Sequence, residues 1–401
     1  MASHVNSLLQ VSKNFRYPWK PEAPVKSDRS AALLLLGAAI LGLVLANSPV
    51  GFALLDLKAT NVGIEALNLS LPIQKWTSDL LLAAFFLVAG LELKYELSKG
   101  VLSKLSTALV PVVAGIGGIA IPALVYSYFN WGTEYMVGWP IPTATDIAFA
   151  LGVLAIFGRG LPKAARVFLL ALAIFDDLVA IMVIAIFYTD NLAIEWLFAA
   201  ALVLAAHAIA ERVPRIPIVA IRFLSFGLAW YAVYQSGVHA TIAGVAMGLI
   251  IPATRSHSLV AKIQPWTNTV ALPVFAFFAV SIALPTFEGE VSSVFNGIAI
   301  ALPVGKIVGI TAFALLANLL AEKSARLNLH PLDFAAVAGL AGIGFTVSLL
   351  MTKLAFESMP EIRAEATLAV IVGSLLSLAF GAYLSQLRGR HYAKLAKQQD
   401  Q

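Results

Sequence analysis

The sequence has no cysteine and few charged residues. Without cysteine, the chain cannot form a disulfide framework, a thiolate metal site or a cysteine nucleophile. Charged residues make up only 12% of the 401 residues and hydrophobic residues 60%, whereas soluble domains average about 25% charged and about 45–50% apolar residues. The core of a soluble protein cannot bury so large an excess of apolar residues. The composition therefore predicts one integral membrane protein without a separate soluble domain.

The formal net charge of +5 does not indicate a nucleic-acid partner. The basic residues come in short clusters between apolar runs, which suits orientation signals of membrane spans better than a nucleic-acid surface. We therefore expect contact with membrane lipid, no nucleic acid, no redox chemistry and no cofactor.

Apolar runs of the length that crosses a bilayer as a helix, roughly 17–25 residues, recur along the chain. They predict an all-α polytopic membrane protein with twelve transmembrane helices in one domain over residues 31–387. A cytoplasmic leader at 1–30 and a solvated cytoplasmic tail at 388–401 flank it. Residues 60–71 alternate weakly between apolar and polar, which fits either a short outward hairpin or a plain loop. The spans are placed near residues 31–48, 76–94, 105–129, 137–157, 164–188, 192–210, 217–234, 238–253, 266–286, 293–319, 332–356 and 363–387.

The distribution of lysine and arginine supports this span count. Most of the 27 basic residues fall in loops on the side shared with the N-terminus. Lys58, Lys75, Lys353 and Arg363 fall in loops on the other side, and Lys306 alone remains deep inside a span. Because basic loops stay in the cytoplasm, both termini are predicted to be cytoplasmic, in a multi-pass protein of the inner membrane.

Two spans at corresponding positions are interrupted by helix-weakening residues. Spans three to five and ten to twelve each have such a middle helix, and paired interruptions of this kind indicate inverted repeats with a binding site at the membrane midplane. The interrupting residues are Pro140, Pro142, Thr143 and Thr145 in the fourth span, and Gly339, Gly342, Gly344 and Thr346 in the eleventh.

Ionisable residues inside these spans are the candidates for function. A charge at mid-bilayer costs about 2.5–3.5 kcal/mol on insertion scales, so such side chains face protein or water and are functional by default. Asp176, Asp177, Asp146 and Lys306 lie deep within apolar segments, whereas Asp79 and Glu92 are predicted nearer the ends of the second span.

The adjacent acids Asp176 and Asp177 suggest exchange of a cation for protons. Neighbouring residues on a helix project about 100° apart, so the two can border one cavity in different roles. Two carboxylates close together in a low dielectric cannot both ionise freely. Oxygen ligands suit hard cations such as sodium, and an unwound stretch at 143–145 could add hydroxyl and carbonyl oxygens. The alternative is that the acids pair with Lys306 only to lock helices together.

Four motifs resemble those of the NhaA sodium/proton antiporters, and the similarity runs across nearly all twelve spans. The motifs are PTATDIAFALG at 142–152, ALAIFDDL at 171–178, SGVHATIAG at 236–244 and GIGFTVS at 342–348. The resemblance implies that broken helices four and eleven cross at the midplane. It also implies secondary active exchange of sodium or lithium out for protons in, serving pH and sodium homeostasis, and a homodimer.

The resemblance assigns roles to individual residues. Asp176 and Asp177 would carry the ion and the protons, and Thr145 would be a supporting ligand. Asp146 would offset the positive half-helix ends and Lys306 the negative ones, as dipole electrostatics requires. Lys306 is expected to pair with Asp176. If that pair breaks when sodium binds, Lys306 can release a proton and exchange is electrogenic; otherwise Lys306 is a strut.

Two further residues would belong to a cytoplasmic funnel and the pH response. The resemblance puts Glu92 in the funnel, and His239 is either part of pH regulation, which its ordinary pKa suits, or a hydrogen-bonded anchor. The segment at 260–264, VAKIQ, lacks the acids and histidine usual in the family, so the pH response is expected to differ. His207 in the sixth span is expected to be structural.

Two other classes of protein share some of these features. An intramembrane aspartyl protease also needs two buried carboxylates, which Asp146 and Asp177 could supply, but Lys306 would then be unexplained. A passive cation channel would show rings of acids along a continuous pore. Interrupted helices around a single deep acid pair favour a carrier.

Overall fold

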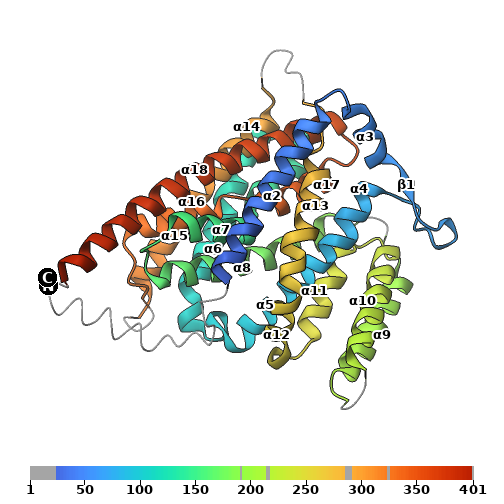
Figure 1. Cartoon of the computed structure of the whole chain (residues 1–401), viewed down its shortest axis with the longest axis horizontal. Coiled ribbons are helices and arrows are strands. Elements are labelled where there is room, and N and C mark those ends of the chain that lie inside the picture. Colours follow the sequence, from blue (N-terminus) through green and yellow to red (C-terminus); the bar gives the residue numbers. More distant parts are fainter. Residues whose placement is uncertain (1–23, 190–191, 214–216, 285–290, 323–325, 400–401) are drawn as a thin grey trace.

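The computed structural model describes residues 24–189, 192–213, 217–284, 291–322 and 326–399. Within these ranges the molecule is a helical bundle with one small β hairpin (Figure 1). Seven helices are long and apolar enough to cross a membrane, or nine if each of two bent helix pairs is counted as one span. Two shorter apolar helices, α9 and α11, accompany them.

The first span and its connection form one side of the bundle. Helix α2 (Pro24–Ala46) leads into α3 (Gly51–Ala59) and then into strands β1 (Asn61–Val62) and β2 (Leu71–Pro72), which bracket the short helix η1 (Glu65–Leu67). The strands pair antiparallel, Val62 opposite Leu71, so residues 60–71 contain the predicted hairpin and not a plain loop, while its outward orientation stays a prediction. The side that carries these strands is called the hairpin side below.

The second span is a continuous helical run with a wide turn inside it. It consists of α4 (Ile73–Trp76), the π-helical turn η2 (Thr77–Leu81) and α5 (Leu82–Lys99). A short turn, η3 (Val101–Ser103), follows. Helix α5 packs along α11 (Thr241–Ile250) and α12 (Ala253–Trp266). Helix α12 continues through the π-helical turn η6 (Thr267–Ala271) into α13 (Leu272–Val280), which packs on α2.

Two long helices pack with their backbones nearly touching. Helix α6 (Leu105–Asn130) lies along α15 (Lys306–Leu320), which continues from α14 (Ser293–Ile300) through the π-helical turn η7 (Ala301–Gly305). A Cβ atom on Gly117 would lie 2.5 Å from the Gly309 carbonyl oxygen, and one on Gly309 would lie 2.1 Å from that of Gly117. Only glycine permits this approach. The contact fixes the position of Lys306 at the start of α15.

Two bent helix pairs lie at the centre of the bundle. One runs from η4 (Glu134–Gly138) and η5 (Ile141–Thr143) into α7 (Ile147–Phe157), with a bend of 42°. The other joins α16 (Pro331–Ala341) to α17 (Phe345–Ala355), with a bend of 49°. Both breaks fall within the segments whose proline, glycine and threonine content predicted them. Helix α8 (Lys163–Phe187) packs against α6, α7 and α16.

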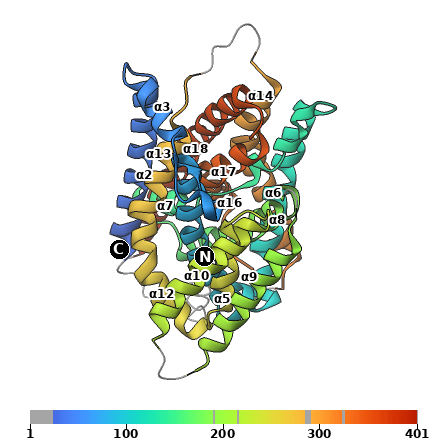
Figure 2. The ribbon, with the colours of Figure 1, turned by 90° about the vertical axis from the view of Figure 1, so that its right-hand side faces the viewer.

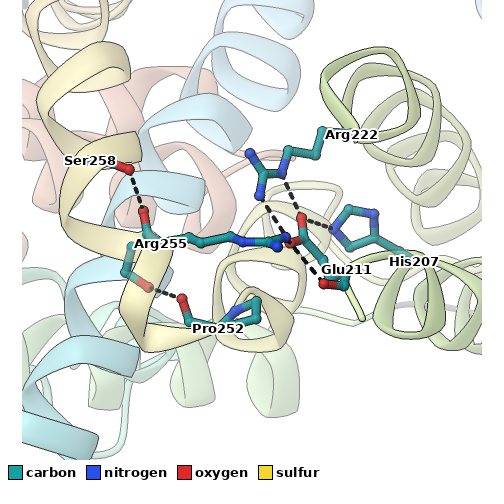
Figure 3. Close-up of polar contacts among 7 residues, drawn as sticks. His207, Glu211, Arg222, Pro252, Arg255 and Ser258 are labelled. Carbon is teal, nitrogen blue, oxygen red and sulfur yellow. Dashed lines mark hydrogen bonds and ion pairs between the residues drawn. The ribbon is translucent and has the colours of Figure 1, made fainter. Parts of the chain in front are cut away.

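Helices α9 (Ile194–Ala210) and α10 (Ile218–Gln235) stand side by side at one edge of the bundle (Figures 1 and 2). Ion pairs around the buried Glu211 carboxylate join the end of α9 to α10 and α12 (Figure 3). Arg222 of α10 donates two hydrogen bonds to the Glu211 carboxylate, at 2.6 and 2.9 Å, and Arg255 of α12 donates one at 2.7 Å. His207 is fully buried, with Nε2 3.6 Å from Glu211.

The last helix, α18 (Pro360–Gln399), runs well past the predicted end of the twelfth span. Arg388 is only 7% exposed and donates to Asp333 of α16 at 2.7 Å, while the Tyr392 hydroxyl donates to the other Asp333 oxygen at 2.6 Å. The expectation of a solvated tail from residue 388 is therefore wrong at its start. An arginine near the end of a span usually predicts a loop, but Arg388 forms an ion pair with the buried Asp333.

Candidate functional site

The two helix breaks lie against each other and exchange hydrogen bonds, and their meeting point is called the crossing below. The Asp146 amide donates to the Ile343 carbonyl at 2.7 Å, and the Ser348 hydroxyl donates to the Ile141 carbonyl at 2.6 Å. At the end of α16, the Ala341 carbonyl lies 2.7 Å from the Thr145 hydroxyl. Backbone groups freed by a break inside a membrane must find partners in the protein. Each break supplies partners for the other.

Asp146 serves the first turns of two helices with one carboxylate. Its Oδ1 accepts from the Phe149 amide of α7 at 2.9 Å, and its Oδ2 accepts from the amide and hydroxyl of Thr346 of α17, at 3.2 and 2.8 Å. Helix N-termini carry partial positive charge. A negative charge at this point would compensate both half-helices, which is the role predicted for Asp146.

The expected pairing of Lys306 with Asp176 is present. The Lys306 ammonium is fully buried, 2.7 Å from Asp176 Oδ2, and it also donates to the Thr145 hydroxyl at 3.0 Å. Thr145 in turn lies 2.7 Å from Asp176 Oδ2. Because a hydroxyl has one proton, Thr145 can donate to Asp176 or to the Ala341 carbonyl, but not to both at once. Lys306, Thr145 and Asp176 thus form one buried network at the crossing.

Asp177 lies beside this network without a cation of its own. It is 4% exposed, and its Oδ2 has no hydrogen-bond partner among the described residues; the same holds for Oδ1 of Asp176. An ionised carboxylate cannot stay buried and unpaired without a large cost. Asp177 must therefore bind a proton or a cation, and the free Asp176 oxygen can share that cation.

Glu92 and His239 have different partners in different parts of the bundle. Glu92 of α5 accepts a hydrogen bond from Gln264 of α12 at 3.2 Å. His239 instead approaches Asp79 of η2, with Nε2 3.7 Å from Oδ1. Asp79 precedes Glu92 by more than three helical turns, about 20 Å along the axis. Glu92 and His239 therefore lie at different depths of the bundle, and the funnel role of Glu92 and the pH role of His239 stay predictions.

A second buried charged cluster on the hairpin side was missed by sequence reasoning. Asp79 is only 3% exposed, and Lys353 of α17 donates to its neighbour Ser78 and lies 3.9 Å from the Asp79 carboxylate. Lys353 is therefore not a loop residue, and Asp79 is not at a span end where its charge could reach solvent. The sequence feature that could have predicted this cluster is the lysine within the apolar run SLLMTKLAF at 348–356. It was missed because Lys353 was assigned to a loop.

Comparison with known proteins identifies the family. The family model described as Na+/H+ antiporter 1 matches residues 22–384. The chain belongs to this family. It is 44% identical over 375 residues to the Na(+)/H(+) antiporter NhaA 2 of Clavibacter michiganensis, covering 91% of this chain and 92% of that protein. It is 41% identical over 394 residues to the Na(+)/H(+) antiporter NhaA of Thermobifida fusca, covering 92% and 94%.

Membership of the Na+/H+ antiporter 1 family confirms the resemblance found in the four motifs. It makes the chain a membrane transporter rather than an enzyme, so the aspartyl protease alternative is wrong. Within the described residues, no group of three or more His, Asp or Glu side chains is placed to hold a metal ion. Any ion bound at Asp176 and Asp177 would take its remaining ligands from hydroxyl and carbonyl oxygens.

Proposed function

We propose that the protein exchanges sodium for protons, with Asp176 and Asp177 as the shared binding site. The observation that carries this proposal is the unequal environment of the two acids. Lys306 neutralises Asp176, whereas Asp177 is buried without a cation and keeps an oxygen without a partner. Such a carboxylate holds a proton when no cation is present and releases it to coordinate one.

The neutral ligands for sodium are supplied by the crossing. Thr145 contributes a hydroxyl oxygen and the end of α16 contributes the Ala341 carbonyl, both within the network of Asp176. Hard cations of this kind prefer oxygen ligands. In this proposal Asp146 stabilises the two positive half-helix ends, and Lys306 stabilises the negative ends through Thr145. Lithium would bind through the same ligands.

The behaviour of Lys306 decides which groups carry the two protons. If sodium at Asp176 displaces the ammonium, Lys306 loses its counter-charge in a buried position, and lysine gives up its proton readily there. That proton, together with the one from Asp177, would make exchange electrogenic. If Lys306 keeps its proton, it only braces Asp176 and compensates the helix ends, and the two aspartates carry both protons.

We further propose twelve spans with both termini in the cytoplasm. The seven long helices, the two bent pairs, the short helices α9 and α11 and the helical run 73–99 together support that number. The crossing of the two bent pairs supports inverted repeats of spans three to five and ten to twelve. The resulting inner-membrane antiporter would serve pH and sodium homeostasis, Glu92 would sit in its cytoplasmic funnel, His239 would take part in its pH response, and a homodimer remains its expected assembly.

Sealed vesicles test the exchange directly. The purified protein is reconstituted in vesicles that hold an imposed pH gradient, and sodium is added outside. An antiporter dissipates the gradient in proportion to added sodium, whereas a passive cation channel changes the membrane potential without proton coupling. Choline in place of sodium is the control for ionic strength. A gradient that responds equally to both salts would contradict the proposal.

A further inference from the structure

A cavity of about 680 Å³ opens on the hairpin side, apart from the crossing. It lies among α3, η2, α13, α17 and α18, and its volume is in the range of small-molecule sites. Much of its lining is polar. Three basic side chains contribute, each from a different helix: Lys58 of α3, Lys353 of α17 and Arg363 of α18. Gln74, Thr77 and Ser78 add further polar groups.

The Lys58 end of this cavity is electropositive. The Lys58 ammonium donates to the carbonyls of Phe278 and Ser281, where α13 ends. Burial, and then the positive charges of Arg363 and Lys353, lower the pKa of Lys58 to about 8. The charged neighbours that act on this ammonium are thus both cations. Three cationic groups from separate elements have been brought close together at some electrostatic cost.

The acids of the cavity do not neutralise Arg363. Glu361 and Glu365 also line it, but neither forms an ion pair with Arg363 within the described part of the chain, and the Arg363 guanidinium donates no hydrogen bond to another described residue. One Glu365 oxygen is itself buried without a partner. Arg363 therefore presents a guanidinium fork, the donor arrangement that matches an oxyanion in two places at once.

We propose that this cavity binds an oxyanion, a phosphate or sulfate group either free or on a lipid head group, between Lys58, Lys353 and Arg363. The guanidinium fork and the two ammonium groups come from three different helices and supply donors from several directions, which suits a tetrahedral oxyanion. A bound oxyanion joins α3, α17 and α18 through one group. Helix α17 is half of a bent pair and carries Thr346 at the crossing. A bound oxyanion would therefore restrain the position of this helix.

Inorganic sulfate is the probe, because it does not titrate near neutral pH. The thermal unfolding midpoint of the purified full-length protein in detergent is measured against potassium sulfate, with potassium chloride at equal ionic strength as reference. We expect a saturable rise with sulfate. Arg363→Gln should weaken the apparent sulfate affinity about tenfold, the effect of one charge-assisted hydrogen bond. Lys75→Gln removes a charge on the same side outside the cavity and should leave the affinity unchanged.

The pH dependence provides a second readout. Glu361, Glu365, Lys353 and Arg363 line the cavity together with Lys58, and the Asp79 carboxylate lies 3.9 Å from Lys353. Burial and the charges of Arg363 and Lys353 lower the pKa of Lys58 to about 8. Sulfate affinity should therefore fall between about pH 7 and about pH 9, and Lys58→Gln should weaken binding at the lower pH and remove this dependence. Sodium exchange in vesicles shows that each variant is folded.

Competition distinguishes the two sources of the oxyanion. If the natural ligand is a lipid head group, dioctanoyl phosphatidylglycerol competes with sulfate more strongly than glycerol 3-phosphate does; if it is a free anion, the two compete equally. A sulfate effect that does not saturate, or that is the same in wild type, Arg363→Gln and Lys58→Gln, reflects general salt stabilisation and overturns the proposal. So does an equal loss in Lys75→Gln.

Discussion

At the scale of single residues, Asp177 differs from every other buried acid described here. Asp146 accepts three hydrogen bonds, and Asp176 and Asp333 each have a basic partner at 2.7 Å. Asp79 and Glu211 also have basic side chains within 4 Å, and the buried Glu96 accepts a hydrogen bond from the Val101 amide at 2.8 Å. The acid with least compensation is the one that gains most from binding a proton or an ion.

Replacement of Asp177 by asparagine should abolish exchange without unfolding the protein. The amide matches the carboxylate in shape but can neither release a proton nor neutralise a cation. We expect sodium-driven dissipation of the pH gradient to fall below about one hundredth of the wild-type rate. Asp176→Asn should impair it severely as well. Asp56→Asn, an exposed acid of α3, is the matched control. Wild-type exchange in Asp177→Asn would remove this residue from the site.

Sodium and protons should compete for the same carboxylates. Because these must be deprotonated before they coordinate a cation, the apparent sodium affinity should weaken as pH falls. It can be measured as the sodium concentration that gives half-maximal dissipation at a series of pH values. An affinity that stays flat from acid to alkaline pH would show that the two ions bind at separate places.

Lys306→Gln separates the two roles of this lysine. If Lys306 carries a proton, the neutral variant moves one charge fewer per cycle, and any exchange that survives should lose its voltage dependence. The measurement is the exchange rate in vesicles with and without an imposed potential. Arg326, whose side chain donates only to carbonyls at the end of α15, provides the control variant Arg326→Gln. Exchange in Lys306→Gln that still accelerates with the potential would make the lysine a strut.

At the scale of elements, the peripheral pair α9–α10 is attached by charge as well as by apolar packing. Burial opposes the charge of Glu211, but hydrogen bonds from Arg222 and Arg255 bring its pKa below the ordinary value of 4.5. A carboxylate with a lowered pKa stabilises the fold fully above that ordinary value. The contribution is lost as pH falls through the folded-state pKa.

Glu211→Gln should therefore destabilise the protein by about 2 kcal/mol at neutral pH, because the buried side chain at this position loses its charge-assisted hydrogen bonds to Arg222 and Arg255. The thermal unfolding midpoint of the variant should be lower than that of wild type. The difference should shrink below about pH 4, where wild type is protonated too. Glu65→Gln, on the exposed turn between the strands, should show neither effect. A difference independent of pH would attribute the loss to packing alone.

The sequence predicted the elements of the site better than their neighbours. The breaks at 143–146 and 342–344 were predictable because proline, glycine and threonine weaken helices locally. The Lys306–Asp176 pair was predictable because unpaired charges are costly inside a membrane. The Asp79–Lys353 cluster was not, because its members look like loop or span-end residues until three-dimensional packing brings α17 against η2. The same holds for Arg388, whose partner Asp333 is 55 residues earlier in the chain.

At the scale of the whole molecule, the hairpin side and the side with the α18 C-terminus should face opposite compartments. The chain has no cysteine, so a single introduced cysteine reports its own accessibility. In intact cells, a membrane-impermeant thiol reagent should label Ala66→Cys, on the exposed turn between β1 and β2, and should not label Gln398→Cys, which is exposed near the end of α18. In inverted vesicles the pattern should reverse. Labelling of Gln398→Cys in intact cells would overturn the proposed orientation.

The position of Lys306 depends on the number of residues in the π-helical turn η7, which directly precedes it. Such a turn arises when one extra residue is accommodated within an α-helix, and it is frequent at functional sites. Removing one residue from 301–305 would let the helix close into regular α geometry and would rotate α15 relative to α14 by about 100°. The Gly117–Gly309 contact between α6 and α15 resists that rotation. The shortened chain would therefore be strained near residue 306, and the Lys306 ammonium would point away from Asp176. Among homologous chains, the identity of these five residues should therefore vary far more readily than their number. The deletion of one residue from this turn would indicate loss of transport more strongly than most substitutions.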